Sequence, residues 1–243
     1  MTHRSTSLLC ELHAHTTWSD GSLSLPELVD LYGRSGFDVL CVTDHCVRAD
    51  DPPAASGPLH VHEGNHEDYV AALEREATRA RSLYDLLVIP GLELTYDDPD
   101  PRLSAHAVAV GLRRFVGLDD GFDVALGEAR RAGAALIAAH PYPLSATDGS
   151  LRRTARFAES WVELAPPVDR FELFNRHELF GWVAAARLPV VATGDFHVRE
   201  HLATWKTLIP CRKDEQSVVE HLTSGRPVHL TRVEPAAPAS LAA

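Results

Sequence analysis

The feature of this sequence that most constrains its fold is a repeated alternation of short apolar runs with amphipathic helical patterns. The apolar runs are typical of buried strands because they are short, continuous and bounded by turn residues. They span residues 8–12, 38–43, 86–89, 105–110, 134–139, 171–174, 189–192 and, more briefly, 227–230. Helices are expected at 24–35, 67–83, 124–132, 150–159, 178–187 and 214–222. Repeated βα units of this kind form either an open doubly wound sheet or a closed barrel.

Polar side chains at the strand ends decide between these two architectures. Histidines and carboxylates follow the expected strands or, for His106, stand at the start of one: His13, His15, Asp20, His45, Glu93, His106, His140, Asp195 and His197. In an open sheet, so many strand ends lie along a line too long for one site. In a barrel they converge on one mouth. The sequence therefore predicts an α/β barrel, and 243 residues suit a single barrel domain.

The same nine residues predict a metal site. Six neutral imidazoles and three carboxylates cannot form an apolar core, since buried polar groups need partners. Nine ligands are too many for one cation, but they suit two or three divalent ions with open positions for water or substrate. A mixture of histidine and carboxylate ligands favours zinc, manganese or iron over calcium or magnesium.

The motifs resemble those of the PHP (polymerase and histidinol phosphatase) family over residues 8–232. They are His13-x-His15 with Asp20, Thr43-Asp-His45, Glu93, His106, His140-Pro and Asp195-x-His197. The resemblance implies a distorted (β/α)7 TIM-like barrel with a trinuclear metal centre that hydrolyses phosphoesters. It also implies three sets of ligands: His13, His15, Glu93 and Asp195 for one metal, Glu93, His106 and His140 for the second, and Asp20, His45 and His197 for the third. Some relatives have a histidine where this chain has Asp20.

The expected activity is that of a metal-dependent phosphoric ester hydrolase. A water that bridges two metals loses a proton near neutral pH, and the resulting hydroxide can attack phosphorus in line, with Glu93 bridging the metals. The leading interpretation is a phosphomonoesterase that acts on a small phosphorylated metabolite or nucleotide. The candidate general acid is His177, and Arg176 and Arg199 are candidate phosphate contacts because a guanidinium binds phosphate through two parallel hydrogen bonds.

Three alternatives remain open. A phosphodiesterase or exonuclease of the same fold would act on nucleotides or short oligonucleotides, but the net charge of −11 and the lack of an evident basic groove disfavour larger nucleic acids. A metallo-amidohydrolase usually bridges its metals through a carboxylated lysine, and Lys206 and Lys213 are the only lysines here. A non-catalytic metal-binding regulator is the third alternative.

The location and domain boundaries are expectations of the same kind. The N-terminus lacks the apolar stretch of a signal peptide and no run is long enough to span a bilayer, so we expect a cytoplasmic protein with no membrane partner. One domain is expected over 8–232, between a flexible N-terminus (1–7) and a flexible C-terminal tail (233–243). The sequence leaves the oligomeric state and the particular substrate open.

Overall fold

The computed structural model describes residues 7–50, 59–144, 154–161 and 168–234. The expected flexible ends lie almost entirely outside these residues, as does the first part of the helix expected at 150–159. Within the described residues, the strands are β1 (Leu8–Glu11), β2 (Val39–Val42), β3 (His45–Val47), β4 (Leu87–Tyr96), β5 (Ala105–Val110), β6 (Ala135–Ala139), β7 (Arg170–Asn175), β8 (Glu178–Leu179), β9 (Val190–Thr193), β10 (Trp205–Ile209) and β11 (His229–Arg232). The helices are α1 (Leu25–Arg34), α3 (His66–Tyr84), α4 (Phe122–Arg131), α5 (Arg156–Ser160), α6 (Gly181–Ala185), the 3-10 helix η1 (Arg199–Leu202) and α7 (Glu215–Thr223).

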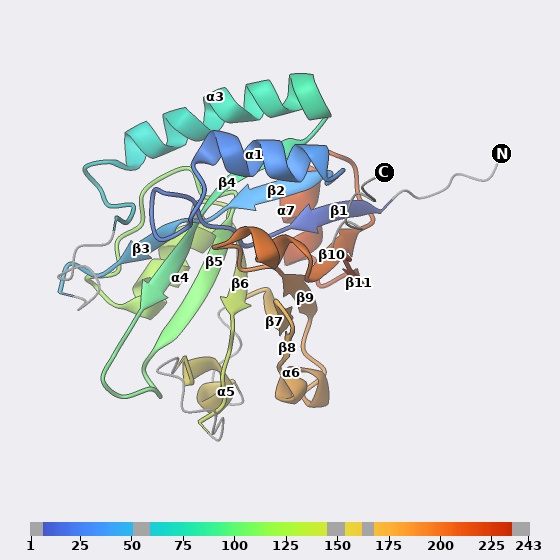
Figure 1. Ribbon diagram of the computed structural model, residues 1–243. Helices are drawn as coiled ribbons and strands as arrows, with labels where there is room; N and C mark the ends of the chain where they lie inside the picture. Colours follow the sequence, from blue (N-terminus) through green and yellow to red (C-terminus); the bar gives the residue numbers. More distant parts are fainter. Residues whose placement is uncertain (1–6, 51–58, 145–153, 162–167, 235–243) are drawn as a thin grey trace, which may run out of the picture.

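The strands form one curled sheet in the order β11-β10-β1-β2-β4-β5-β6-β7-β8, with β3 paired to β4 and β9 paired to β7 (Figure 1). The curl closes beyond the end of β1, where Ala14 forms a parallel bridge with Phe196. Here the His15 amide donates to the Phe196 carbonyl at 2.9 Å, and the Phe196 amide donates to the His13 carbonyl at 3.1 Å. The fold is therefore a distorted α/β barrel, as expected.

The distortion has a clear origin in β5, which runs antiparallel to both of its neighbours. In contrast, β2 pairs in parallel with β1 and β4, and β7 pairs in parallel with β6 and β9. The start of β5 consequently lies beside the carboxyl ends of the parallel strands. His106 pairs in register with Thr95 on β4 and Ala139 on β6, so a histidine at the start of a strand reaches the same barrel end as the others.

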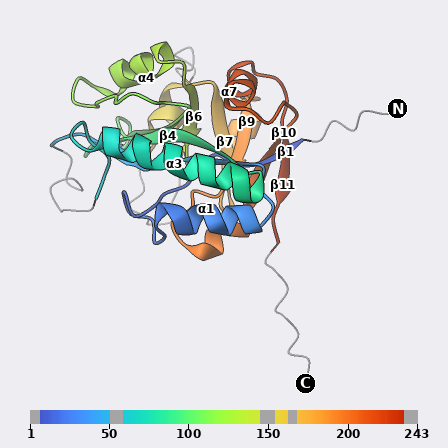
Figure 2. The same ribbon diagram turned by 90° about the horizontal axis from the view of Figure 1, so that it is seen from above.

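Alternate residues along the strands face two different apolar clusters. Leu40 and Val42 of β2 join the cluster packed under the helices, whereas Val39 and Cys41 join the cluster inside the barrel. α1 and α3 run side by side over the outer face of the sheet (Figures 1 and 2). α7 contributes Val218 and Leu222 to the inner cluster. None of the helices in the described part of the chain has both the length and the apolar character needed to span a membrane.

Some element boundaries differ from the sequence expectation. The Pro90-Gly91 pair is typical of a turn, yet β4 continues through it to Tyr96 because it pairs with β5 on one side and β3 on the other. Glu93 therefore lies within a strand rather than after one, and His45 begins the unexpected strand β3. The helix expected at 178–187 is instead the short strand β8 followed by the five-residue helix α6.

Candidate metal centre

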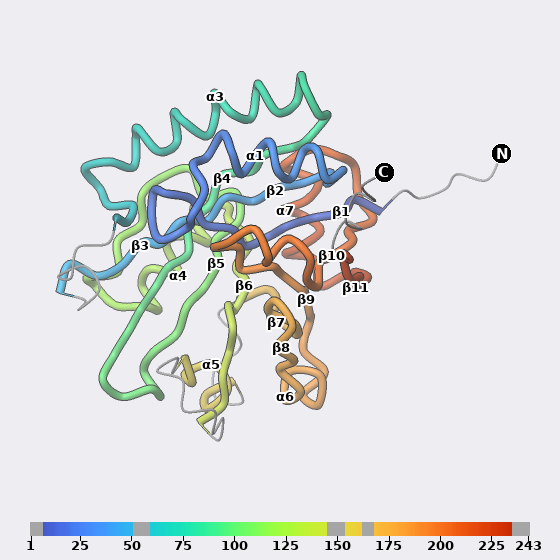
Figure 3. The backbone as a smooth tube through the Cα atoms, viewed as in Figure 1, coloured from blue at the N-terminus to red at the C-terminus, as the bar shows by residue number. Residues whose placement is uncertain are grey.

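The structure brings all nine predicted ligands to one end of the barrel. The connections after β1 and β9, which are far apart in the sequence, run side by side there (Figure 3), and the Ser22 amide donates to the His197 carbonyl at 2.8 Å. Ligand atoms gather into three groups, each with its atoms within 4.8 Å of one another. The groups are His13, His15 and Glu93; Glu93, His106 and His140; and His15, Asp20, His45 and His197.

Glu93 is the shared member of the first two groups and is fully buried. Its Oε1 atom lies 3.1 Å from His140 Nε2 and 3.3 Å from His106 Nδ1. Its Oε2 atom lies 3.4 Å from Nε2 of both His13 and His15. One carboxylate in the middle of β4 thus faces histidines from β5 and from the connections after β1 and β6, which is the arrangement expected of a bridging ligand.

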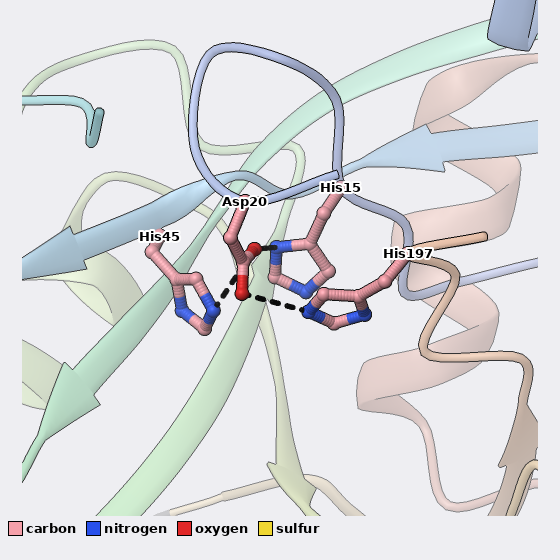
Figure 4. Close-up of side chains that lie close together, drawn as sticks. All are labelled: His15, Asp20, His45 and His197. Atoms are coloured by element: carbon pink, nitrogen blue, oxygen red, sulfur yellow. Dashed lines mark ion pairs between the residues drawn. The ribbon is translucent and has the colours of Figure 1, made fainter. Parts of the chain in front are cut away.

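The third group surrounds Asp20, whose side chain points from the loop after β1 toward three histidines (Figure 4). The carboxylate lies 3.2 Å from His197 Nε2, 3.5 Å from His45 Nε2 and 3.7 Å from His15 Nδ1. With its side chain 46% exposed, Asp20 is the most accessible of the nine ligands, whereas His13 and His15 are fully buried.

Asp195 lies beside the first group. Its Oδ1 atom is 3.5 Å from His15 Nε2 and 3.7 Å from His13 Nε2. The preceding Gly194 is required because a Cβ atom there would lie 2.3 Å from both the Glu11 carboxylate and the Lys206 ammonium. These two groups form a fully buried ion pair at 2.9 Å, and Glu11 also accepts the Gly194 amide at 2.8 Å. The segment that carries Asp195 is therefore tied to Glu11 of β1 and packed beside Lys206 of β10.

His15 and Glu93 have pKa values that suit cation binding. Burial and the neighbouring rings of His45 and His197 lower the pKa of His15 to about 3, so its ring is neutral and keeps a lone pair at neutral pH. Burial by itself would raise the pKa of Glu93, but His13 and His45 outweigh it and hold that pKa well below the usual value. Both residues are thus in the protonation state that a metal ligand needs.

Two buried atoms are suited to binding a metal. Glu93 Oε2 and His106 Nδ1 make no well-aligned hydrogen bond among the described residues, although Oε2 lies 2.8 Å from His45 Nδ1 and His106 Nδ1 lies 3.3 Å from Glu93 Oε1. A buried polar atom without a partner is costly, and a bound cation would satisfy both of these. Histidine nitrogen with carboxylate oxygen is the ligand chemistry of zinc, manganese and iron.

Two supporting carboxylates were not identified from the sequence. Glu172 on β7 lies 3.0 Å from His13 Nδ1, and Asp97 lies 3.1 Å from His106 Nε2. Each contacts the ring nitrogen that faces away from Glu93, as carboxylates commonly do behind metal-binding histidines. Glu172 could have been found as a charged residue within an otherwise apolar expected strand, whereas Asp97 lies among other acidic loop residues and carries no such signal.

The three predicted substrate contacts lie in different environments. The Arg176 guanidinium lines the cavity beside the ligands and pairs with Asp195 Oδ2 at 2.9 Å. His177 is exposed in the turn between β7 and β8, and Arg199 is exposed at the start of η1. Neither is among the cavity-lining residues.

The ligands open into a cavity of about 270 Å³. Its wall consists of seven of the nine ligands together with Asp97, Thr154 and Arg176. Polar, mostly ionisable groups therefore surround a small space, which suits a compact charged ligand.

A family model described as the PHP domain matches residues 11–177. This match covers more than half of the chain, and the chain belongs to the PHP domain family. Asp195 and His197 lie beyond the matched residues, and their place beside the other ligands comes from the structure. No curated protein matches the chain.

Two solved structures have a similar fold. One is a two-domain protein from Bacteroides vulgatus containing a predicted PHP-like metal-dependent phosphoesterase, with 20% identity and a TM-score of 0.64 over 94% of this chain and 65% of that chain. The present chain thus spans just under two thirds of that relative. The other is an amidohydrolase from Chromobacterium violaceum with bound sulfate and no metal, with 14% identity and a TM-score of 0.53 over 92% of this chain and 97% of that chain.

Proposed function

We propose that this chain is a metal-dependent phosphoesterase that hydrolyses a phosphomonoester of a small molecule. The observation that carries the proposal is the joining of the three ligand groups through two shared residues, Glu93, which lines a small polar cavity, and His15, which is buried behind it. Membership of the PHP domain family supports the same activity, as does the description of the relative from Bacteroides vulgatus.

The nine ligands would hold two or three divalent ions, of which zinc, manganese and iron are the candidates. Such ions supply Lewis acidity toward phosphate oxygens and activate water for in-line attack. The carboxylates of Asp195 and Glu93 would neutralise part of the metal charge, and both lie beside His13 and His15. Arg176, held at the cavity wall by Asp195, is placed to contact a phosphate oxygen.

The cavity supports a small substrate rather than an oligonucleotide. A volume of about 270 Å³ lies below the range of roughly 300–1,000 Å³ that is typical of sites for drug-sized ligands. The two lysines also argue against a carboxylated-lysine amidohydrolase. Lys206 is buried against Glu11, Lys213 pairs with Asp38 at 2.9 Å, and neither lines the cavity.

The proposal is tested by metal analysis of the purified chain and by phosphate release from p-nitrophenyl phosphate and bis(p-nitrophenyl) phosphate. We expect at least two divalent ions per chain and faster turnover of the monoester. His13→Ala and Glu93→Ala should abolish turnover, whereas the matched control His229→Ala, at an exposed histidine on β11, should retain it. Turnover that survives both ligand substitutions contradicts the proposed site, and faster turnover of the diester replaces the monoesterase with a phosphodiesterase.

A further inference from the structure

Glu172 is a carboxylate buried within the barrel wall behind the metal ligands. It lies on β7 and is fully buried. Four hydrogen-bond donors converge on its two oxygens. Oε1 accepts from His13 Nδ1 at 3.0 Å and from the Thr193 hydroxyl at 2.6 Å. Oε2 accepts from the Asn175 amide at 2.8 Å and from the His140 backbone amide at 2.6 Å.

We propose that Glu172 is a positioning residue that sets the tautomer of His13 and holds the backbone of His140. These two histidines belong to different ligand groups, so one buried carboxylate orders ligands of two metal positions. The inference rests on the proposed metal centre, because it assigns Glu172 a role toward the ions that His13 and His140 would bind.

The tautomer follows from the chemistry of the two side chains. A carboxylate has no proton to donate, so His13 Nδ1 must carry the hydrogen in this contact. In the neutral ring, Nε2 then holds the free lone pair. Nε2 faces the other ligands, at 3.0 Å from His15 Nε2 and 3.4 Å from Glu93 Oε2. Glu172 therefore presents the ligating nitrogen of His13 in its unprotonated form.

The same carboxylate supports an unusual backbone at His140. This residue has φ of +28°, in the left-handed region that favours glycine. Its backbone amide donates to Glu172, and its ring nitrogen Nε2 lies 3.1 Å from Glu93 Oε1. The hydrogen bond helps to hold the His140 backbone where the ring can reach the shared ligand.

Glu172→Gln makes a sharp test because only one orientation of the new amide suits the site. The His140 backbone amide can only donate, so the glutamine oxygen must occupy the Oε2 position. The glutamine NH₂ group then occupies the Oε1 position. The Thr193 hydroxyl can rotate and become an acceptor, but His13 Nδ1 must lose its hydrogen to accept. The substitution consequently moves the His13 proton to Nε2, toward the metal.

The first measurement is nitrogen-15 NMR of the histidine rings in the zinc-loaded and metal-free proteins. In the wild type we expect a protonated Nδ1 for His13 in both states. In metal-free Glu172→Gln we expect an unprotonated Nδ1, with the ring hydrogen on Nε2. An unprotonated Nδ1 of His13 in the wild type overturns the proposal, and this reading is available even where the variant does not fold.

The second measurement is zinc affinity by calorimetry, with Thr193→Val as the matched control. Loss of a supporting carboxylate typically weakens metal binding by about 10- to 100-fold, and we expect this loss in Glu172→Gln. Thr193→Val removes one donor to the same Oε1 atom but keeps the carboxylate, so His13 Nδ1 stays protonated and zinc affinity falls less. Equal affinity of Glu172→Gln and the wild type contradicts the proposal.

These outcomes are separable from a failure of the proposed function. A wild-type protein that binds no metal contradicts the metal centre itself, whereas the NMR reading of His13 in the metal-free protein still tests its contact with Glu172. A wild-type protein that binds metal but is indifferent to Glu172→Gln contradicts only the positioning role.

Discussion

The two ends of the barrel use buried polar groups in opposite ways. At the end away from the ligands, Arg170 is almost fully buried at the start of β7, and it donates hydrogen bonds to the carbonyls of Leu222, His221, Arg226 and Val190 at 2.6–3.3 Å. Two of these acceptors lie in the last turn of α7, the helix that adds its apolar face to the barrel interior. At the ligand end, Glu93 Oε2 and His106 Nδ1 face other candidate ligands and make no well-aligned hydrogen bond among the described residues.

This difference separates stability from function along one strand. Arg170 and Glu172 are two residues apart on β7, yet Arg170 satisfies carbonyls of the chain itself and Glu172 supports candidate metal ligands. In barrels of this kind the loops at one end carry the active site, while the other end contributes to stability. The expected consequence is that substitutions at the two ends change different measurable quantities.

Among the substitutions that compare the two ends, His106→Ala at the ligand end should have the largest effect on metal binding and turnover. Its buried Nδ1 lies 3.3 Å from Glu93 Oε1 without a well-aligned hydrogen bond, so its loss costs little folding free energy but removes a ligand beside Glu93. We expect metal affinity at this group and phosphate release to fall by more than about 100-fold, beyond the loss typical of supporting residues. Calorimetry and a turnover assay check this, and cooperative unfolding should persist by circular dichroism. A His106→Ala variant with a lowered free energy of unfolding but unchanged metal affinity would contradict the difference between the two ends.

Arg170→Met is the counterpart at the other end. The substitution preserves much of the side-chain volume but leaves buried carbonyls without a donor, which should lower the free energy of unfolding by about 3–5 kcal/mol. For a chain of this size, the melting temperature should fall by about 10 °C. Metal content and turnover of the remaining folded protein should match the wild type. A large loss of metal from Arg170→Met without a fall in its free energy of unfolding would contradict the separation of stability and function between the two ends.

The position of the ligand end could be predicted from the sequence, because apolar runs followed by His and carboxylate residues indicate which strand end carries the site. The reversal of β5 could not be predicted, since Ala105–Val110 has the same apolar pattern in either direction. The extension of β4 through Pro90-Gly91 was also missed, because local turn chemistry is overridden by pairing with β3 and β5. Glu172 and Asp97 were missed because their roles depend on which histidine nitrogen they face.

A smaller effect should come from Asp97→Asn. The asparagine oxygen can still accept from His106 Nε2, but it lacks the charge that Asp97 places there. In the metal-free site, burial lowers the pKa of His106, but the contacts with Asp97 and Glu93 outweigh it and raise that pKa to about 9. We expect metal affinity to fall by about 10-fold, with Asp100→Asn in the same loop as the unaffected control. Equal losses in the two variants would assign the effect to loop charge rather than to His106.

The smallest effects are expected for His177→Ala and Arg199→Ala. Both side chains are exposed, and neither lines the cavity. We therefore expect kcat/KM to stay within about threefold of the wild type. Arg176→Ala is the matched comparison, since its guanidinium lines the cavity, and kcat/KM should fall further. A His177 variant that loses turnover with a shifted pH profile would restore His177 as the general acid.

The most direct test of the account is anomalous diffraction from crystals of the metal-loaded protein. We predict at least two peaks within about 2.0–2.2 Å of ligand atoms, with Glu93 bound to ions on both sides and His13, His106 and His140 among the remaining ligands. Anomalous peaks that lie away from Glu93 in fully loaded crystals would contradict the account.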